Sequence, residues 1–313
     1  MTIVVSAPGK IFLMGEHAVV YGKPALLACV NKRVSVTVEE GKSMTRIQSL
    51  DNNYILEIVD FVKNHFKMNS FPSLSITVSS QIKSGYHLGS SAAVAVATIA
   101  ALLFFLKKIW NPELVNKLAY EVEKIKHGNP SGADNSTVIF GGFVWYRKEL
   151  ENLKSIWQVP IKMPSVLNHF YLVDTGNPKE STYEMVARVA KAHNQNKNFM
   201  DHLFNINEES TKKIAASLKE KDIPGLIDSI KIGQSSLEQI GVVGKNVIPF
   251  IRSIEKKGGA AKILGGGGLS TVGYLLCFHE NLESFKKLVK LHKYSFEPIT
   301  LGEEGLRLEK GKK

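Results

Sequence analysis

One aspartate stands behind turn residues that would fix the direction of its side chain. Asp134 follows a Pro-Ser-Gly sequence in the segment 127–136, HGNPSGADNS. Pro-Ser-Gly is typical of a sharp bend, and the residues before it have the spacing of a helix. A carboxylate held in this way can either stabilise the turn or accept the proton of a hydroxyl group. At this point both interpretations stay open.

A lysine near the N-terminus is the second candidate for chemistry. Lys10 lies in the segment 7–12, APGKIF, where we expect a Pro-Gly turn between two short apolar strands. A lysine with a fixed backbone can stabilise charge on a phosphoryl group during transfer, although an ordinary lysine at a strand edge is the alternative. Glu16 and His17 follow as a polar pair between apolar strands. They are either a buried hydrogen-bonded pair or a substrate contact.

The segment 84–93, SGYHLGSSAA, places glycines and two serines directly before an apolar helix. The first turn of a helix offers unpaired N–H groups and the positive end of the helix dipole, and glycines let a phosphate approach the backbone. A capped helix behind a flexible loop is the alternative, because serine is a favoured N-cap residue. The segment is neither a Walker loop nor a dinucleotide fingerprint.

Two oxygen-bearing side chains could hold a metal ion near these phosphates. The Ser91 hydroxyl, in the first turn of the helix, can reach a magnesium ion, which usually takes only one or two ligands from protein. Glu123 is the candidate carboxylate, because it ends a helix that leads to Asp134 and borders the apolar stripe of that helix. We expect it to line a cleft without entering the core. A surface glutamate paired with lysines is the alternative.

A run of four glycines at residues 265–268 lies between two apolar segments in the second half of the chain. Such a run cannot pack a core, so either a backbone approaches a ligand closely, with a phosphate as the candidate, or the loop is mobile. No group of cysteines and histidines has zinc spacing, and no G-x-S-x-G sequence is present.

Strands and helices alternate around these candidates. After the two N-terminal strands, the patterns predict a strand over 25–40, an amphipathic helix over 55–67, a strand over 72–82, a buried helix over 92–106 and a helix that begins at Asn111 and Pro112.

The polar stretch 149–164 is the most plausible domain boundary. Beyond it, the predicted order is strand, helices, strand, strand, helix, strand. This order is typical of a split β-α-β layer of the ferredoxin-like type.

The composition favours a globular protein over a membrane or nucleic-acid-binding protein. The 313 residues are 44% apolar, which suits two domains with their own cores. The formal charge of +11 favours anionic partners, but the basic residues are dispersed and mixed with acids, so we expect no nucleic-acid surface.

The longest apolar run, of about 15 residues, falls short of the ~20 that span a bilayer, and the N-terminus lacks the pattern of a secretory signal. Cys29 and Cys277 lie in apolar runs, so we expect them to be buried free thiols. Free thiols suit a reducing cytoplasm.

Together and in this order, these segments resemble the GHMP kinase family, named for galacto-, homoserine, mevalonate and phosphomevalonate kinases. All three motif regions of the family are present and extend over nearly the whole chain. Within the family, the segments 6–26 and 127–136 look most like those of mevalonate kinases. The resemblance implies an α+β fold of two domains. These are a ribosomal-S5-like α/β domain at residues 1–164, with the nucleotide and magnesium site, and a ferredoxin-like α/β domain at residues 165–313 on the substrate side.

The resemblance also implies a role for each matching residue. Asp134 matches the catalytic aspartate that accepts or orients the proton of the substrate hydroxyl, and Lys10 matches the lysine that interacts with it and with the reacting groups. Ser91 and Glu123 match the magnesium ligands. The residues expected at the nucleotide are Gly85, His87, Leu88, Gly89, Ser90, Ser91 and Ala92, and those expected at the substrate are Lys10, Glu16, His17, Asp134 and Thr182.

Two regions depart from the family pattern. The family's nucleotide loop usually reads Pro-x-Gly-x-Gly-Leu-Gly-Ser-Ser, whereas Lys83 stands at the proline and His87 at the middle glycine. A side chain at position 87 narrows the space above the triphosphate, which bears on nucleotide affinity and base preference. The family's third motif usually carries threonine and a longer glycine run with alanine, whereas Leu264, Leu269 and Ser270 interrupt that pattern here.

The expected function is therefore an ATP-dependent, magnesium-requiring mevalonate kinase of isoprenoid precursor synthesis, which converts mevalonate to 5-phosphomevalonate and ADP. A kinase for a related acceptor, such as phosphomevalonate, is the nearest alternative. A non-catalytic ligand-binding member of the family is another. We expect ATP and mevalonate as partners, no nucleic acid and no membrane, a possible homodimer, and a cytoplasmic location.

Overall fold

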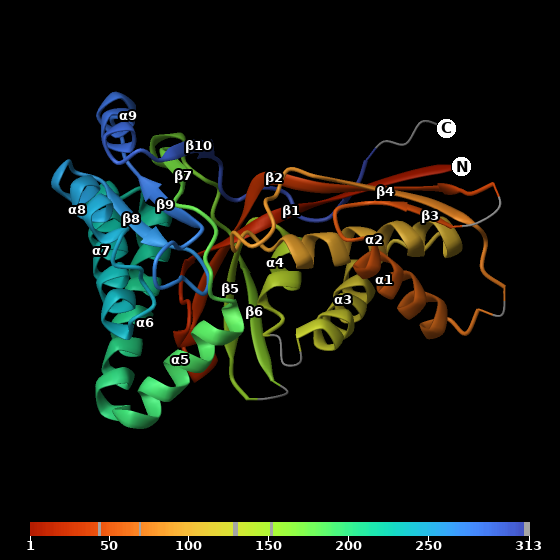
Figure 1. The fold of residues 1–313 in the computed structure, drawn as a ribbon, viewed down its shortest axis with the longest axis horizontal. Coiled ribbons are helices and arrows are strands. Elements are labelled where there is room, and N and C mark those ends of the chain that lie inside the picture. The colour runs from red at the N-terminus through yellow and green to blue at the C-terminus, as the bar shows by residue number, and fades with distance from the viewer. Residues whose placement is uncertain (43–44, 69, 128–130, 151–152, 310–313) are drawn as a thin grey trace.

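The computed structural model describes residues 1–42, 45–68, 70–127, 131–150 and 153–309. Its strands form two sheets, and helices pack against both (Figure 1). The mixed α+β architecture predicted from the sequence is confirmed.

Seven strands of the described chain form the larger sheet. Their order is β11-β1-β2-β4-β3, and β5 pairs with both β2 and β6. Every pair is antiparallel except β3 with β4. The strands are β1 (Thr2–Met14), β2 (Ala25–Glu40), β3 (Arg46–Gln48), β4 (Leu74–Ser80), β5 (Phe143–Lys148), β6 (Lys154–Val159) and β11 (Arg307–Leu308).

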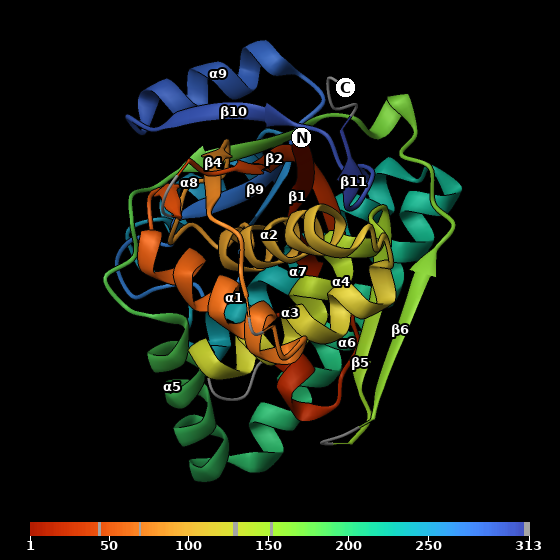
Figure 2. The same cartoon turned by 90° about the vertical axis from the view of Figure 1, so that its right-hand side faces the viewer.

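Helices α1, α2 and α3 lie together on one side of this sheet (Figures 1 and 2). The helices that accompany the sheet are η1 (Ala18–Tyr21), α1 (Asn52–His65), α2 (Ser90–Lys107), α3 (Pro112–His127) and α4 (Ala133–Phe140). The predicted start of α3 is confirmed, because the Asn111 side chain accepts the Leu114 backbone N–H at 3.0 Å and Pro112 is the first helical residue.

Helix α2 is the central helix of this half and packs on both β1 and β2. In the part of the chain that the structure describes, it is the one helix long and apolar enough to cross a membrane by composition, yet 61% of that window is buried inside the protein. Its burial fits the core helix that the sequence predicts.

The second half follows the predicted order of elements. Strands β7 (Phe170–Asp174), β8 (Ala260–Ile263), β9 (Tyr274–Phe278) and β10 (Ser295–Ile299) form an antiparallel sheet in the order β10-β7-β9-β8. The helices of this half are η2 (Ser165–Leu167), α5 (Thr182–Gln195), α6 (Lys197–Glu220), α7 (Ile223–Ile240), α8 (Ile248–Lys256) and α9 (Leu282–Leu291).

The first strand differs from its prediction. Residues 2–14 form one strand, β1, rather than two strands separated by a turn. The pairing with β2 shifts between Pro8, which lies opposite Arg33, and Gly9, which lies opposite Val30. Pro8 therefore stands at a bulge, where the lack of a backbone N–H is tolerated within a sheet.

The two halves of the chain are closely joined. The stretch 149–164, predicted as a boundary, contains β6 of the larger sheet, and the last strand, β11, returns to pair with β1. One cluster of buried apolar residues includes Ile11 of β1 and also Leu172 and Leu276 of the smaller sheet. Side chains from both halves therefore share a core beside the first strand.

Candidate active site

The side chains of Lys10 and Asp134 meet as an ion pair. Lys10 Nζ lies 2.9 Å from Asp134 Oδ2, and the two side chains are 4% and 35% exposed. Lys10 comes from the middle of β1 and Asp134 from the first turn of α4. The lysine is thus held inside the protein while the carboxylate keeps a face toward solvent.

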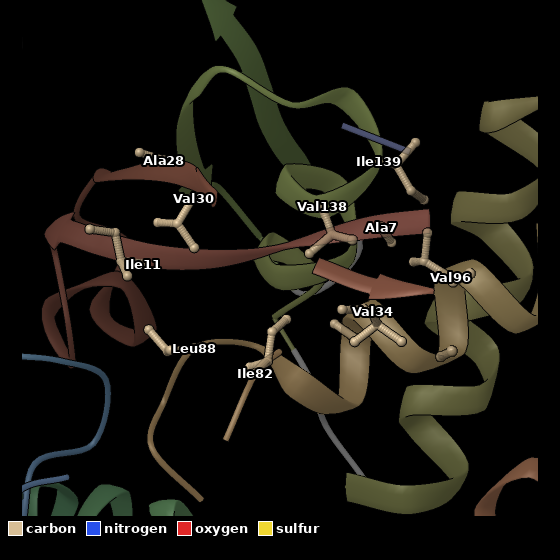
Figure 3. Close-up of a cluster of buried hydrophobic side chains, with 14 of the residues drawn as sticks. Ala7, Ile11, Ala28, Val30, Val34, Ile82, Leu88, Val96, Val138 and Ile139 are labelled. Atoms are coloured by element: carbon tan, nitrogen blue, oxygen red, sulfur yellow. The ribbon is translucent and has the colours of Figure 1, made fainter. Parts of the chain in front are cut away.

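The position of Lys10 depends on the glycine that precedes it. A Cβ atom on Gly9 would lie 3.1 Å from both the Ile82 side chain and the Leu88 carbonyl oxygen. That carbonyl accepts the backbone N–H of Lys10 at 2.9 Å. Figure 3 shows Ile82 and Leu88 directed toward the apolar cluster that also includes Ile11. The glycine-containing loop before α2 is therefore fastened to β1 beside Lys10.

The direction of Asp134 is fixed by the start of α4. Gly132, with φ of 82°, is the N-cap residue, so the Asp134 carboxylate does not cap the helix. An acidic side chain in the first turn interacts favourably with the helix dipole. Residues 128–130 of the predicted motif lie outside the described residues. The Asp134 carboxylate thus contacts Lys10 rather than the helix end, and its role as a proton acceptor stays a prediction.

The loop and first turn of α2 have the features predicted for an anion site. Gly89, with φ of 72°, is the N-cap residue, and no side chain caps the helix. The capped-helix alternative is therefore wrong, and the N–H groups at this end have no side-chain acceptor in the described protein. A Cβ on Gly89 would lie 2.9 Å from Cγ and Cε of Lys10, so the loop runs directly over the lysine stem.

The other residues predicted at the nucleotide differ in what surrounds them. Leu88 and Ala92 are 1% and 2% exposed, so their side chains belong to the core. Ser90 is the first residue of α2. Gly85, with φ of 81°, approaches the second half, where a Cβ would lie 2.9 Å from the Asn177 side-chain oxygen.

Ser91 and Glu123 are brought together by α2 and α3. Ser91 Oγ donates to Glu123 Oε1 at 2.9 Å, and the Tyr54 hydroxyl of α1 lies 3.2 Å from Ser91 Oγ and 3.4 Å from Glu123 Oε1. Glu123 is 6% exposed, so the prediction that it stays out of the core is wrong. Two hydroxyl groups offset the loss of water around its carboxylate. No local pattern singles out Tyr54, which is one of the buried residues of the amphipathic helix α1.

Glu16 forms a second lysine–carboxylate pair, entirely inside the protein. Lys262 Nζ contacts Glu16 Oε1, and the same amine donates to the carbonyl oxygens of Ile263 and Phe12 at 2.6 and 3.1 Å. Burial raises the pKa of Glu16 and lowers that of Lys262, while each partner acts against the shift of the other. This pair joins the end of β1 to β8. The sequence analysis did not single out Lys262, because its partner lies 246 residues away.

His17 connects the N-terminal region to the glycine run. Its Nε2 lies 3.1 Å from the Gly266 carbonyl oxygen, and burial lowers its pKa to about 4. The neutral ring at physiological pH therefore donates an N–H to that carbonyl. Thr182, at the start of α5, lies on the other side of the run, since a Cβ on Gly266 would be 3.3 Å from Thr182 Cα. Two of the residues predicted at the substrate, His17 and Thr182, thus lie beside the same glycine.

His87 packs against the same glycine run from the nucleotide loop. Its φ is 62°, and a Cβ on Gly265 would lie 2.7 Å from Cβ and Cγ of His87. Burial, followed by the charge of Lys10, lowers the pKa of His87 to about 4. Its Nε2 is buried without a hydrogen-bond partner in the described protein. The side chain is accommodated because the facing residue is glycine.

Lys83, which stands at the family's proline position, also reaches the second half. Its Nζ lies 2.7 Å from Asp174 Oδ2 at the end of β7, and the lysine side chain is 55% exposed. The same amine lies over the rings of Tyr86 and Tyr274. A cavity of about 370 Å³ lies beside this lysine. It is lined by Leu50, Ser80, Gln81, Ile82, Lys83, Ser84 and Tyr86.

Among the described residues, no group of three or more His, Cys, Asp or Glu side chains is arranged to hold a metal ion. The Ser91 hydroxyl and the Glu123 carboxylate are both oxygen donors, which suit a hard cation such as Mg²⁺. Two protein oxygens agree with a magnesium ion that takes its other ligands from phosphates and water. The chemistry of this donor pair therefore fits the ion.

The chain is also similar to known proteins. The model of the GHMP kinases N terminal domain matches residues 53–142. A mevalonate kinase from Archaeoglobus fulgidus is 34% identical over 274 residues, which are 85% of this chain and 89% of that protein.

Solved structures show the same fold. The L. major mevalonate kinase in complex with R-mevalonate superposes with a TM-score of 0.81 at 20% identity, and the match covers 96% of each chain. The Streptococcus pneumoniae phosphomevalonate kinase superposes with a TM-score of 0.76 at 19% identity, covering 96% of this chain and 99% of that one. Fold similarity is thus shared by kinases with different acceptors, whereas the sequence match is to a mevalonate kinase.

Proposed function

The chain belongs to the mevalonate kinases of the GHMP kinase family, and on this basis we propose that it transfers the γ-phosphoryl group of ATP to the 5-hydroxyl of mevalonate. The products are 5-phosphomevalonate and ADP. The observation that carries the proposal is the Lys10–Asp134 pair, 2.9 Å apart, directly beneath the loop that precedes α2. A proton acceptor and a cation therefore lie next to an anion-binding helix end.

Asp134 is the proposed catalytic residue at the acceptor. Its half-exposed carboxylate can accept a hydrogen bond from the 5-hydroxyl and take up its proton as the oxygen attacks the phosphoryl group. Holding the hydroxyl in one direction also contributes, because phosphoryl transfer depends chiefly on positioning.

Lys10 is the proposed electrostatic partner. Its ammonium lies beside Asp134 and under the Gly89 backbone, so it can interact both with the carboxylate and with a phosphoryl oxygen. A fixed positive charge of this kind stabilises the negative charge that develops on the transferring group.

ATP use follows from the kinase family, and we place the nucleotide along the loop and α2. Phosphates would contact the first-turn N–H groups of α2, which no side chain caps. The 370 Å³ cavity beside Lys83 is the proposed site of the nucleoside, since it adjoins the same loop and has the size of a small-ligand pocket.

Ser91 and Glu123 would hold magnesium together with the nucleotide. When bound, the ion would neutralise charge on the phosphate oxygens. The contribution of the protein is to keep the two oxygen donors 2.9 Å apart at the helix end.

Three further points stay predictions. We propose the division into residues 1–164 and 165–313 as functional units, with the shared core between them. The cytoplasmic location is supported by two buried free cysteines. The third point is the homodimer.

An ADP-release assay with three acceptors tests the function. We expect turnover with mevalonate and little with phosphomevalonate or homoserine. Turnover with phosphomevalonate but not mevalonate would select the alternative kinase. No turnover with any acceptor, despite nucleotide binding, would favour the non-catalytic alternative, although the intact Lys10–Asp134 pair argues against it.

A further inference from the structure

Tyr54 occupies a position that the assigned roles do not explain. It lies in the first turn of α1 and is 4% exposed. Its backbone N–H is accepted by the Asp51 side chain at 3.0 Å, which caps the helix. The start of α1 is therefore fixed next to the proposed metal ligands.

The Lys126 ammonium packs over the ring of Tyr54. The Lys126 ammonium lies 3.4 Å from the ring centroid and 3.6 Å from Asp51 Oδ2. Cation–π contact and the link to the capping residue together restrain the ring. The hydroxyl is thereby directed to one place, between α2 and α3.

At that place, three oxygen atoms from three helices meet. Tyr54 Oη lies 3.4 Å from Glu123 Oε1 and 3.2 Å from Ser91 Oγ, and the last two are 2.9 Å apart. Ser91 and Glu123 are the proposed magnesium ligands, so the tyrosine hydroxyl contacts both of them at once.

We propose that Tyr54 is a positioning residue of the magnesium site, whose hydroxyl holds the Glu123 carboxylate beside Ser91 in the geometry that binds the ion. This inference rests on the proposed function, because it takes Ser91 and Glu123 as the ligands. A hydrogen bond to a ligating carboxylate fixes its orientation, and removal of such a partner typically costs 10–100-fold in metal affinity.

The direction of the hydrogen bond agrees with this role. The Tyr54 hydroxyl donates to Glu123 Oε1. It offers the carboxylate a donor and adds no positive charge that would compete with the ion.

The decisive variant is Tyr54→Phe, which removes the hydroxyl and keeps the ring against Lys126. Binding of Mn²⁺ to the protein with ADP, followed by electron paramagnetic resonance, is the readout. We expect Mn²⁺ affinity to fall by about 10–100-fold, with ADP affinity in the absence of metal unchanged.

A matched control is Tyr274→Phe. Its hydroxyl also contacts a carboxylate, Glu297 Oε1 at 3.1 Å, but in the smaller sheet. This variant should bind Mn²⁺ like the unmodified protein. In steady-state assays, Tyr54→Phe should raise the Mg²⁺ concentration needed for half-maximal rate while kcat at saturating Mg²⁺ recovers, which a general structural defect would not produce.

The ligand variants separate two kinds of failure. If Ser91→Ala and Glu123→Gln weaken Mn²⁺ binding but Tyr54→Phe changes it less than about twofold, the role of Tyr54 is wrong and the magnesium site stands. If none of the three changes Mn²⁺ binding, the magnesium assignment itself is wrong, and with it the inference. Should Tyr54→Phe unfold, Lys126→Met releases the ring from the exposed side, and unchanged Mn²⁺ affinity in that variant would overturn the inference.

Discussion

The two lysine–carboxylate pairs at the centre of the molecule have the same chemical groups and different surroundings. In the pair Lys10–Asp134, the carboxylate side chain is 35% exposed. In the pair Lys262–Glu16, the two side chains are 0% and 1% exposed. Solvent access therefore separates a carboxylate that a substrate can reach from one that only the protein contacts.

The lysine of the first pair also acts on the second pair. The charge of Lys10 lowers the pKa of both Glu16 and Lys262, although burial is the largest cause of each shift. Replacing the exposed carboxylate of Asp134 should thus lower the rate of catalysis. Replacing one member of the buried pair should lower the free energy of unfolding. The variants below test this distinction.

Asp134→Asn should have the largest effect. The amide keeps the volume of the side chain and removes the charge and the proton acceptor, so kcat should fall by about 10²–10⁴-fold. ATP affinity, measured by calorimetry, should change little because the α2 helix end is untouched.

Asp201→Asn is the matched control. Asp201 contacts His193 Nε2 at 2.9 Å on the helical part of the second half, so its loss should leave kcat unchanged. If Asp134→Asn retained a rate within a few-fold of the unmodified enzyme, the assigned mechanism would be wrong.

Lys262→Met should mainly lower stability. The substitution leaves the Glu16 carboxylate buried without its cation, and removing one partner of a buried pair typically costs about 3–5 kcal/mol. Urea unfolding measures this loss. Adding Glu16→Gln to the same chain should recover part of it, since no buried charge then remains, and a double variant as unstable as Lys262→Met would contradict the explanation.

These pairs also show how far the sequence could predict the site. Lys10, Ser91 and Asp134 each stand in a short local motif, and Glu123 lies on the helix that leads to Asp134. The structure brings the four residues together as two contacting pairs. Lys262 gave no comparable signal. Its side chain acts on a residue 246 positions away, so its role depends on how β8 is placed beside β1.

The fold could be predicted from local patterns in the same way. The prediction failed where the structure depends on contacts between distant segments. The buried helix α2 and the order of the second half follow from local periodicity. The single strand β1 did not, because Pro8–Gly9 is typical of a turn, and only pairing with β2 turns it into a bulge. Tyr54 likewise carries no local signal, because its hydroxyl contacts Ser91 and Glu123 only where α1 packs beside α2 and α3.

The neutral histidines at the glycine run should make stability depend on pH. The pKa values of His17 and His87 fall from 6.5 to about 4 on folding, so the unfolded chain takes up protons at a pH where the folded one does not. Unfolding free energy should therefore decrease as the pH falls from about 6.5 to about 4, by roughly 1–2 kcal/mol per histidine at about pH 5.

Urea unfolding at a series of pH values measures this slope. His87→Gly restores the residue that the family usually has at this position, and it should make the slope shallower. The φ of 62° also favours glycine there, so no new strain arises. An unchanged slope in this variant would mean that His87 does not titrate as described.

Lys83→Ala should have the smallest effect and so completes the comparison. Lys83 and Asp174 also join the two halves, at 2.7 Å, but the lysine is 55% exposed. Ion pairs of this kind contribute about 0–1 kcal/mol and weaken with salt. At low salt, the free energy of unfolding of the variant should be slightly lower than that of the unmodified protein. At high salt, this difference should disappear. If the free energy of unfolding fell as much as in Lys262→Met, then contact between the halves, rather than burial, would determine how much such a pair contributes to stability.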